Sequence, residues 1–548
     1  MGLIPRRPAD EPGSTWPVAF GFFVSIGGIL FGEYRCSSIE NRNTERKSDL
    51  PAIGYDTGTI AGILAMPFWK TEFATSGELE PSSSQTSLIV SILSAGTFVG
   101  ALLSAPLADV LGRRWAIAVS CTIVFNLGVV LQTISTSQPL FIAGRFFAGA
   151  GVGLVSAQVP LYQSETMPRW IRGAVVGSYQ LCINVGLFIA ALIEYRTHSL
   201  NNTGSYRIPI GVQFLWSITL ATGVIFFPET PRWLIKQDRY ADAAKSLSRL
   251  RRLPPDHAAV IKELDEVKFS HEYEKTLGDS SYLTCFKGSI GKRLLMGCAL
   301  QALQQLSGIN FIFYYGTNYF KQAGFQNNPY AIQIILTAVS IVSILPGLLL
   351  IDKAGRRTIL LIGSIGMTIT QIIIATIGTV IIDPGMTSSN PNLAAQRANI
   401  AFVCFYVFFF EMSWGPCAWI VTGEMFPLKV RARCLSITTA SNWLLNFVIA
   451  FVTPYMTDSQ YGDLKSKVFY VWLVFCAIGI FFVYFCIYET KNLTLEQVDE
   501  LFLNVNKAWK SKLFVPSADM SLDNVTDEMM LERSKGKLPA EVVQIEKK

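Results

Sequence analysis

The sequence carries little charge for its length. Asp, Glu, Lys and Arg make up 16% of its 548 residues, half of the residues are hydrophobic, and the mean hydropathy is +0.36. Soluble proteins carry about 25% charged residues. The shortage argues against a set of soluble domains and indicates a protein that lies in a lipid bilayer. The net charge of +6 gives no indication of nucleic-acid binding.

Histidine is scarce, and the cysteines do not form a disulfide framework. The three histidines, His198, His257 and His271, lie in polar stretches, without metal-ligand spacing or a nucleophile constellation. Of the ten cysteines, all except Cys36 and Cys285 lie inside apolar runs, as small buried hydrophobic residues do. We therefore expect a protein that is not an enzyme and holds neither a metal ion nor a cofactor.

Apolar runs long enough to cross about 30 Å of hydrocarbon recur along the whole chain. We count about twelve, which predicts an all-α membrane protein. After a first, interrupted run they lie near residues 87–108, 115–134, 139–161, 173–195, 208–228, 291–320, 329–351, 358–382, 398–423, 434–455 and 468–487. Basic residues gather in alternate loops, so the positive-inside rule predicts that both termini are cytoplasmic.

Three motifs occur twice, in the same order. "DVLGRR" from Asp109 recurs as "DKAGRR", "ETMPRWIR" from Glu165 recurs as "EMFPLKVR", and "PETPRWL" from Pro228 recurs as "YETKNL". Such a repeat predicts two related six-helix bundles with a site between them near the bilayer midplane, which is a transporter architecture. We expect an N-terminal bundle, a cytoplasmic helical linker, a C-terminal bundle and a cytoplasmic tail, at residues 1–228, 229–290, 291–489 and 490–548.

The charged residues of these motifs are expected to form a cytoplasmic gate. Asp109 with Arg113, and Glu165 with Arg172, can pair across neighbouring spans and latch the inner face while the transporter is open outward. The simpler interpretation is that they are solvated anchors of topology. The predicted gate residues are Asp109, Arg113, Arg114, Glu165, Arg172, Glu229, Arg232, Asp352, Arg356, Arg357, Glu424, Arg431 and Glu489.

Four stretches carry a family resemblance: "GRFFAGAGVGLVSAQVPLYQSE", "PETPRWL", "QQLSGINFIFYY" and "WGPCAW". With them the chain resembles the sugar porter family of the major facilitator superfamily over about residues 16–500, most closely fungal hexose transporters. The resemblance implies the major facilitator fold and uptake of a hexose, with glucose expected, across the plasma membrane by alternating access. It implies a monomer in the lipid bilayer whose partners are the sugar and, in proton-coupled members, protons.

A hexose is dense in hydroxyl groups, so its site needs neutral amides in place of water and an aromatic face for its CH surface. "QQLSGIN" presents amides on one helical face, where Gly308 loosens the helix. Buried amides in a membrane span are costly unless they bind something; hydrogen bonding between helices is the alternative. By the resemblance, the sugar contacts are Gln180, Gln304, Gln305, Asn310, Trp419 and Asn442.

Two positions depart from the family pattern. Ser340 stands where the family usually has a sugar-contacting Asn, so a hydroxyl replaces an amide. Glu411 stands where proton-coupled and fungal members usually have a small residue, whereas animal facilitative glucose carriers have a sugar-contacting Glu. A carboxyl group without a cation there either holds a proton or accepts sugar hydroxyls. We expect a sugar contact.

Proton coupling is expected at Asp56 in "GYDTG" and Arg145 in "GRFFAGAG". A carboxylate that faces an arginine can exchange its ion pair for a proton, which is how energy enters a symporter. A purely structural ion pair is the alternative. Since some facilitators resemble this pattern too, symport and facilitated diffusion both remain open.

The first apolar run is interrupted by a charged stretch at residues 33–54, which includes "EYRCSSIENRNTERKSD". Each charge at the centre of a membrane helix costs about 2.5–3.5 kcal/mol, so this stretch does not lie in lipid. Without it the chain reads "GGILFGYDTGTIAGIL", an uninterrupted span. A translated, unspliced intron is the preferred explanation, and a real outer insertion is the alternative. An inactive variant would be one consequence.

Two further predictions concern the outer surface and the class of function. Asn201, before Asn202 and Thr203, is a candidate glycosylation site on an outer loop, or a chance sequon. A non-transporting sugar sensor is the alternative to a carrier. The polar tail beyond residue 500 has no repeated motif, which favours the carrier.

Overall fold

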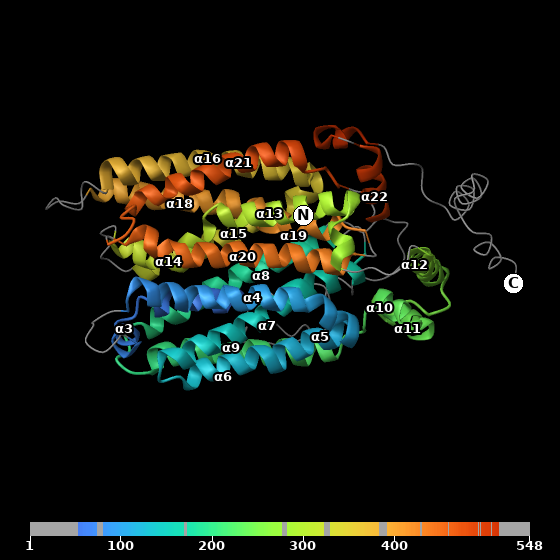
Figure 1. Ribbon diagram of the computed structural model, residues 1–548, viewed down its shortest axis with the longest axis horizontal. Helices are drawn as coiled ribbons and strands as arrows, with labels where there is room; N and C mark the ends of the chain where they lie inside the picture. Colours follow the sequence, from blue (N-terminus) through green and yellow to red (C-terminus); the bar gives the residue numbers. More distant parts are fainter. Residues whose placement is uncertain are drawn as a thin grey trace, which may run out of the picture.

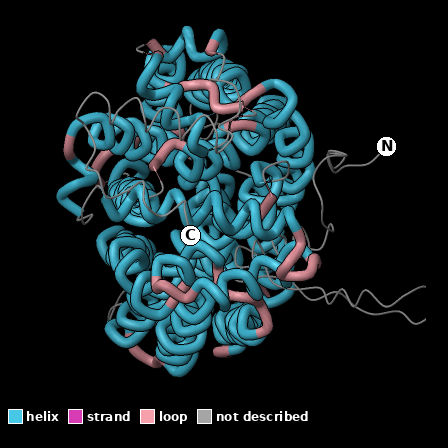
Figure 2. The backbone as a smooth tube through the Cα atoms, turned by 90° about the vertical axis from the view of Figure 1, so that its right-hand side faces the viewer, coloured by secondary structure: helices cyan, strands magenta, loops and turns pink. Residues whose placement is uncertain are grey.

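The structure, a computed structural model, describes residues 53–73, 81–168, 172–276, 282–322, 329–382, 392–427, 430–458, 460–491, 493, 495–505 and 507–514. This part of the chain is helical, without a strand. In Figure 2 many of the helices are seen nearly end-on. The predicted insertion, apart from its last two residues, and the chain from 515 onward lie outside the described residues.

The N-terminal half begins with two short helices. α2 has 11 residues, about 16 Å at 1.5 Å per residue, so its described length does not cross a bilayer. Long helices follow, one of them continued through a π-helical turn. The elements are α2 (Ile53–Ile63), α3 (Pro67–Phe73), α4 (Ser83–Leu111), α5 (Arg113–Val119), η1 (Ser120–Phe125), α6 (Asn126–Ile134), α7 (Gln138–Thr166), α8 (Arg172–Thr197) and α9 (Gly204–Ile225).

Shorter helices connect the halves, and they lie within the predicted linker, residues 229–290. Leu234, Leu247 and Val260 pack in a small hydrophobic core of their own. The elements are α10 (Pro231–Lys236), α11 (Tyr240–Arg251), α12 (Ala258–Thr276) and η2 (Tyr282–Phe286). Figure 1 shows α10–α12 at one end of the bundle, which we call the linker end; the opposite end is the far end.

The C-terminal half repeats the pattern, but two of its predicted spans are broken helices. The span predicted at 291–320 breaks at Gly308 and the span predicted at 398–423 breaks at Ser413. The elements are α13 (Gly288–Leu306), α14 (Ile309–Gln322), α15 (Pro329–Ala354), α16 (Arg356–Ile377), η3 (Gly378–Ile382), α18 (Leu393–Met412), α19 (Trp414–Glu424), α20 (Arg431–Thr457), η4 (Lys465–Lys467), α21 (Val468–Cys486), α22 (Leu495–Asn504) and η5 (Ala508–Leu513).

The break at Gly308 has a local cause. Its φ of +90° is a left-handed conformation that glycine adopts freely, and an added Cβ would lie 2.4 Å from Cγ of Trp472. The carbonyl of Ser307, freed by the break, accepts a hydrogen bond of 2.8 Å from the Tyr406 hydroxyl. Polar neighbours therefore satisfy the interrupted backbone inside the membrane.

Ten helical stretches in the described part are long and apolar enough to cross a membrane. The predicted first and seventh spans are not among them, because α2 is short and Gly308 divides the seventh. The halves meet along α4 against α20 and α8 against α15. The predicted domain boundary at 228 falls between α9 and α10, and the one at 489 between α21 and α22.

Candidate functional site

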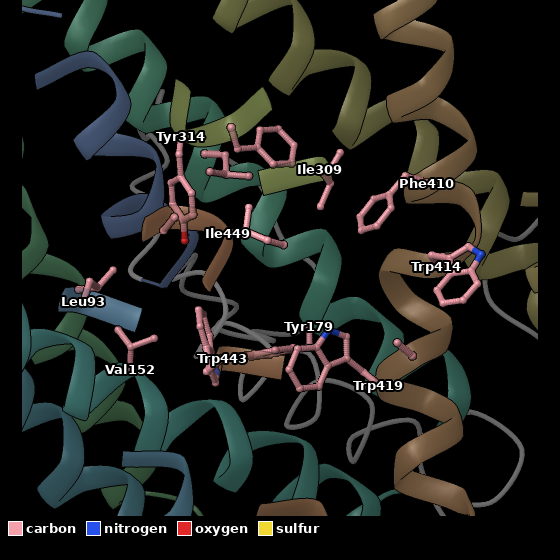
Figure 3. Close-up of a cluster of buried hydrophobic side chains, with 14 of the residues drawn as sticks. Leu93, Val152, Tyr179, Ile309, Tyr314, Phe410, Trp414, Trp419, Trp443 and Ile449 are labelled. Atoms are coloured by element: carbon pink, nitrogen blue, oxygen red, sulfur yellow. The ribbon is translucent and has the colours of Figure 1, made fainter. Parts of the chain in front are cut away.

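A cavity of about 80 Å³ lies between α8 of the N-terminal half and several helices of the C-terminal half. By this measure a single water needs about 10–15 Å³, so the cavity has room for several water-sized polar groups. Its polar wall consists of the side-chain amides of Gln180, Gln304, Gln305, Asn310, Asn442 and Asn446. Its aromatic wall includes Tyr179, Phe410, Trp419 and Trp443, whose side chains are labelled in Figure 3.

The structure thus brings together six of the eight predicted sugar contacts: Gln180, Gln304, Gln305, Asn310, Trp419 and Asn442. The sequence reasoning missed Asn446 and Trp443. Asn446 could have been found, because it follows Asn442 by four residues on the same helix and so shares its face.

The break in the seventh span places its amides. Gln304 and Gln305 lie in the last turn of α13 and Asn310 in the first turn of α14, so the three amides lie on both sides of Gly308. The Asn310 amide donates to Oε1 of Gln305. An interrupted helix between the two halves is a common way to build a transporter binding site.

Asn442 in α20 is the centre of the amide network. Its Nδ2 donates to Oε1 of Gln301 at 2.7 Å and to Oε1 of Gln304 at 2.8 Å, while its Oδ1 accepts from Nε2 of Gln305 at 2.8 Å. Nε2 of Gln304 in turn donates to the carbonyl of Trp414 at 3.0 Å. The amides of α13 and α20 therefore hold one another in fixed orientations.

Two aromatic side chains of the C-terminal half contact the N-terminal half. The rings of Tyr179 in α8 and Trp419 in α19 meet edge to face, with centroids 5.6 Å apart, as Figure 3 shows. Nε1 of Trp443 in α20 donates to the Ser156 hydroxyl in α7 at 3.2 Å. Both halves therefore contribute rings to the wall.

Glu411 and Ser340, the two predicted contacts that depart from the family pattern, do not line the cavity in this conformation. Oε2 of Glu411 accepts hydrogen bonds from Nδ2 of Asn184 at 2.8 Å and Nε2 of Gln180 at 3.4 Å. The Ser340 hydroxyl donates to the carbonyl of Leu336 at 3.0 Å. Glu411 thus reaches the cavity wall through Gln180, which lines the cavity.

Asp56 lies in α2, but its side chain is outside the described residues. Arg145 is 2% exposed in α7, and its Nε donates to the carbonyl of Ile89 in α4 at 2.9 Å. The predicted pairing of Asp56 with Arg145 therefore stays a prediction. Asn201 is exposed between α8 and α9, as a glycan acceptor must be.

At the linker end the first gate motif forms an ion-pair cluster. Arg113 pairs with Asp109 at 3.2 Å and with Glu165 at 3.2 Å. The Glu229 carboxylate accepts the backbone N–H of Arg113 at 3.0 Å and that of Arg114 at 3.2 Å, and so caps α5. Burial raises the pKa of Glu229 above its ordinary value, although these N–H groups and the Arg113 charge oppose the rise.

The second motif repeats this cluster in the C-terminal half. Arg356 pairs with Asp352 at 3.2 Å and with Glu424 at 3.1 Å. The Glu489 carboxylate accepts the backbone N–H of Arg356 at 2.9 Å and that of Arg357 at 3.2 Å. The sequence repeat is thus also a repeat of side-chain geometry.

The remaining gate residues have other contacts. The guanidinium of Arg431 donates to the carbonyl of Phe426 at 2.9 Å, that of Arg357 donates to the carbonyl of Tyr484 at 2.9 Å, and that of Arg114 lies over Trp115. Arg232 forms no ion pair with a described residue, and the side chain of Arg172 is outside the described part.

The ion pairs of both clusters join helices within one half. Among the described residues no ion pair links the two halves. The clusters therefore brace each half at the linker end.

Comparison with known proteins identifies the class. Residues 51–502 match the family model described as "Sugar (and other) transporter", so the chain belongs to that family. It is 53% identical over 530 residues to a major facilitator-type transporter of Aspergillus rugulosus, with 94% of this chain and 93% of that one covered. It is 45% identical to a probable glucose transporter of Neurospora crassa, with 93% and 84% covered.

A further relative is described as a sensor. The chain is 40% identical to a high glucose sensor of Saccharomyces cerevisiae over 93% of its own length and 64% of the sensor's. Among solved structures, the proton:xylose symporter XylE bound to 6-bromo-6-deoxy-D-glucose matches with a TM-score of 0.74 at 23% identity. That match covers 89% of this chain and 100% of XylE and shows the fold.

These matches confirm the predicted sugar porter family and the all-helical major facilitator fold. The chain is a multi-pass membrane transporter of the sugar class, and its family is not one of enzymes, as predicted.

Proposed function

We propose that this chain carries a monosaccharide, a hexose such as glucose, across the plasma membrane by alternating access. One observation carries the proposal: the predicted amides Gln180, Gln304, Gln305, Asn310 and Asn442 converge on one cavity between the two halves. A chain of buried amides that bond mainly to one another is a suitable replacement for water around sugar hydroxyls.

The amide network suits reversible sugar binding. Each amide offers both a donor and an acceptor, so a sugar hydroxyl can exchange with an existing amide–amide bond at little cost. The faces of Tyr179 and Trp419 supply an apolar surface for the CH groups of the ring. No charged side chain lines the cavity in the described part, which favours a neutral ligand.

Contacts between the two halves on the far-end side and on the linker-end side of the cavity support alternating access. Towards the far end, the Ser87 hydroxyl of α4 donates to the carbonyl of Phe451 in α20 at 2.5 Å. Towards the linker end, the Ser436 hydroxyl of α20 donates to the carbonyl of Ala101 in α4 at 2.6 Å. Opening the cavity to one side requires the contacts on that side to break while the others hold.

The finer features of the proposal come from the sequence and the relatives. The linker end with the basic motifs faces the cytoplasm, the carrier acts as a monomer, and residues 1–228, 229–290, 291–489 and 490–548 form the bundles, linker and tail. Asp56 and Arg145 exchange a proton if transport is symport. The Neurospora relative, described as a probable glucose transporter, supports glucose.

Uptake of labelled glucose into yeast that lacks its own hexose carriers tests the proposal. Saturable uptake, reduced by a subset of competing sugars, is expected, and protonophore should abolish accumulation if transport is symport. Uptake that only equilibrates would exclude symport. A chain that reaches the membrane and takes up none of the sugars would contradict the carrier function.

A sensor is the second candidate, favoured by the relative described as a high glucose sensor. The same yeast distinguishes the two: a sensor would induce a glucose-responsive reporter without uptake, whereas a carrier takes up sugar. A deletion of residues 515–548 should leave uptake by a carrier intact.

A further inference from the structure

Glu411 joins the two halves directly behind the sugar site. It lies in α18 of the C-terminal half and is 0% exposed. Its Oε2 accepts hydrogen bonds from Asn184 and Gln180, both in α8 of the N-terminal half. Gln180 also lines the cavity, so a single amide touches both the sugar site and this carboxyl group. When the halves separate along α8, these hydrogen bonds must break.

The surroundings of Glu411 hold no cation in the described part of the chain. α8 presents neutral amides, and α15 presents the backbone carbonyl of Ser340, 3.5 Å from Nδ2 of Asn184. α19 presents Gly415, where an added Cβ would lie 2.9 Å from Oε2. The titratable neighbour is the phenol of Tyr406, which carries no positive charge in either protonation state.

The second carboxyl oxygen of Glu411 also lacks a hydrogen-bond donor among the described residues. Oε1 of Glu411 is buried and has no hydrogen-bond partner among the described residues. α16 approaches this part of α18 with Gly363 against Ser413 and Gly366 against Phe409, and neither glycine carries a side-chain donor. A buried carboxylate that has neither a cation nor a full set of donors is far less stable than the neutral acid.

Asn184 can serve the neutral acid as well as the anion. The two ends of an amide are distinguished only by their hydrogen bonds, and Oδ1 of Asn184 is buried without a partner. Turned over, the amide would place Oδ1 where a protonated Glu411 can donate to it across the same 2.8 Å, in exchange for the 3.5 Å contact of Nδ2 with the Ser340 carbonyl. The closed interface therefore fits a neutral carboxyl group.

We infer that Glu411 is a proton-binding site of the closed carrier, and that the halves close around the sugar only when Glu411 is protonated. When water reaches the separated interface, the carboxyl group can lose its proton. Closure then requires the proton to return, because the closed interface offers the anion no compensating charge. The rate at which the loaded carrier changes sides therefore falls as pH rises. The inference rests on the proposed sugar transport.

Equilibrium exchange of labelled glucose tests the inference. The purified full chain is placed in liposomes with the same glucose concentration and the same pH on both faces, so that no proton gradient drives transport. The exchange rate of the unaltered chain should be lower at about pH 8 than at about pH 5 by more than about fivefold, since one proton changes occupancy by up to tenfold per pH unit. A rate that does not depend on pH overturns the inference.

The informative variant is Glu411→Gln, which keeps the shape of the side chain but cannot lose a proton. Its ratio of exchange rates at the two pH values should be about 1. A ratio equal to that of the unaltered chain overturns the inference.

Asn184→Asp is the second variant, and it leaves Glu411 in place. The new carboxyl group lies 2.8 Å from Glu411, and two carboxyl groups this close favour a shared proton. The fall in exchange rate should therefore move to higher pH. An unshifted profile contradicts the site.

Glu194→Gln is the matched control. Glu194 in α8 is also a buried carboxyl group, 1% exposed, but it accepts the N–H of Gly62 in α2 at 3.2 Å, within the N-terminal half. This variant should keep the pH ratio of the unaltered chain; a flat profile here would show that the effect is not specific to Glu411. A chain that exchanges no glucose at any pH contradicts the proposed function instead, so the two failures differ.

Discussion

The hydroxyl of Ser94 in α4 donates a hydrogen bond of 2.7 Å to Oδ1 of Asn446 in α20. The same oxygen accepts from the Tyr314 hydroxyl at 3.0 Å, and Nδ2 of Asn446 reaches Oε1 of Gln305 at 3.4 Å. Since Asn446 also lines the cavity, one side chain belongs both to the site and to the interface between the halves. The proposed sugar site and the interface between the halves therefore share a residue.

Asn446→Leu should raise the KM for glucose by about threefold to tenfold, because it removes a lining amide and leaves the polar groups around it without partners. KM is measured from initial uptake rates normalised to the amount of protein at the membrane. Ser94→Ala is the control: it removes only the donor across the interface, so its effect on KM should be smaller. An unchanged KM for Asn446→Leu would remove this residue from the site.

Asn442→Asp should reduce glucose uptake by at least about tenfold. The shape is kept, but a carboxylate cannot donate to the oxygens of Gln301 and Gln304, which the Asn442 amide reaches at 2.7 and 2.8 Å. Uptake is compared with that of Asn442→Ala, which removes the donors without adding charge. If the Asp variant transports as well as the unaltered chain, the amide network does not form the site.

Gly355→Ala and Gly112→Ala should each lower the free energy of unfolding of the purified chain by about 2 kcal/mol or more, and with it the melting temperature. Their φ angles are +94° and +87°, and an added Cβ would lie 2.3 Å from Oε2 of Glu489 and 2.5 Å from Oε2 of Glu229. Both variants should therefore lose the carboxylate cap of the following helix. Gly211→Ala is the matched control, since a Cβ there meets nothing within 4 Å. Equal melting temperatures for all three would contradict the role of the caps.

Asp458→Asn should leave the pH dependence of glucose exchange unchanged between about pH 5 and pH 8. The N–H of Gln460 and the hydroxyl of Ser83 hold the pKa of Asp458 below its ordinary value. A depressed pKa keeps the group charged throughout this range, so its hydrogen bond to α4 weakens only when pH falls below the ordinary value of 3.8. Loss of the pH dependence in this variant would place the relevant proton at the far end rather than at Glu411.

Deletion of residues 33–54 should increase glucose uptake, because it restores "LFGYDTG" and a first span long enough for the bilayer. Sequencing of the spliced transcript across this region is the direct measurement. If the corresponding nucleotides are absent from abundant message, the shorter chain is the working carrier. If they are present and the deletion lowers uptake, the insertion is a functional part of the protein.

The sequence alone determined the fold class and the approximate positions of the helices. Long apolar runs in a bilayer must be helices, because every backbone polar group needs a partner there. The repeated motifs identified both linker-end clusters, since Arg113 lies four residues after Asp109 and Arg356 four after Asp352, one turn of the same chain. Motif resemblance also selected Gln304, Gln305 and Asn442, and the structure brings these three residues to one cavity.

Only the tertiary structure decided which side chains meet across helices. Glu411 was expected to contact the sugar; in the structure it does not line the cavity, and it accepts hydrogen bonds from Asn184 and Gln180. Asn446 was not expected at all, although it links α4 to the site. Such contacts depend on how each helix is rotated and how closely it packs against its neighbour, and spacing along one helix carries no information about either. The local pattern specified each helix, and packing between helices specified the site.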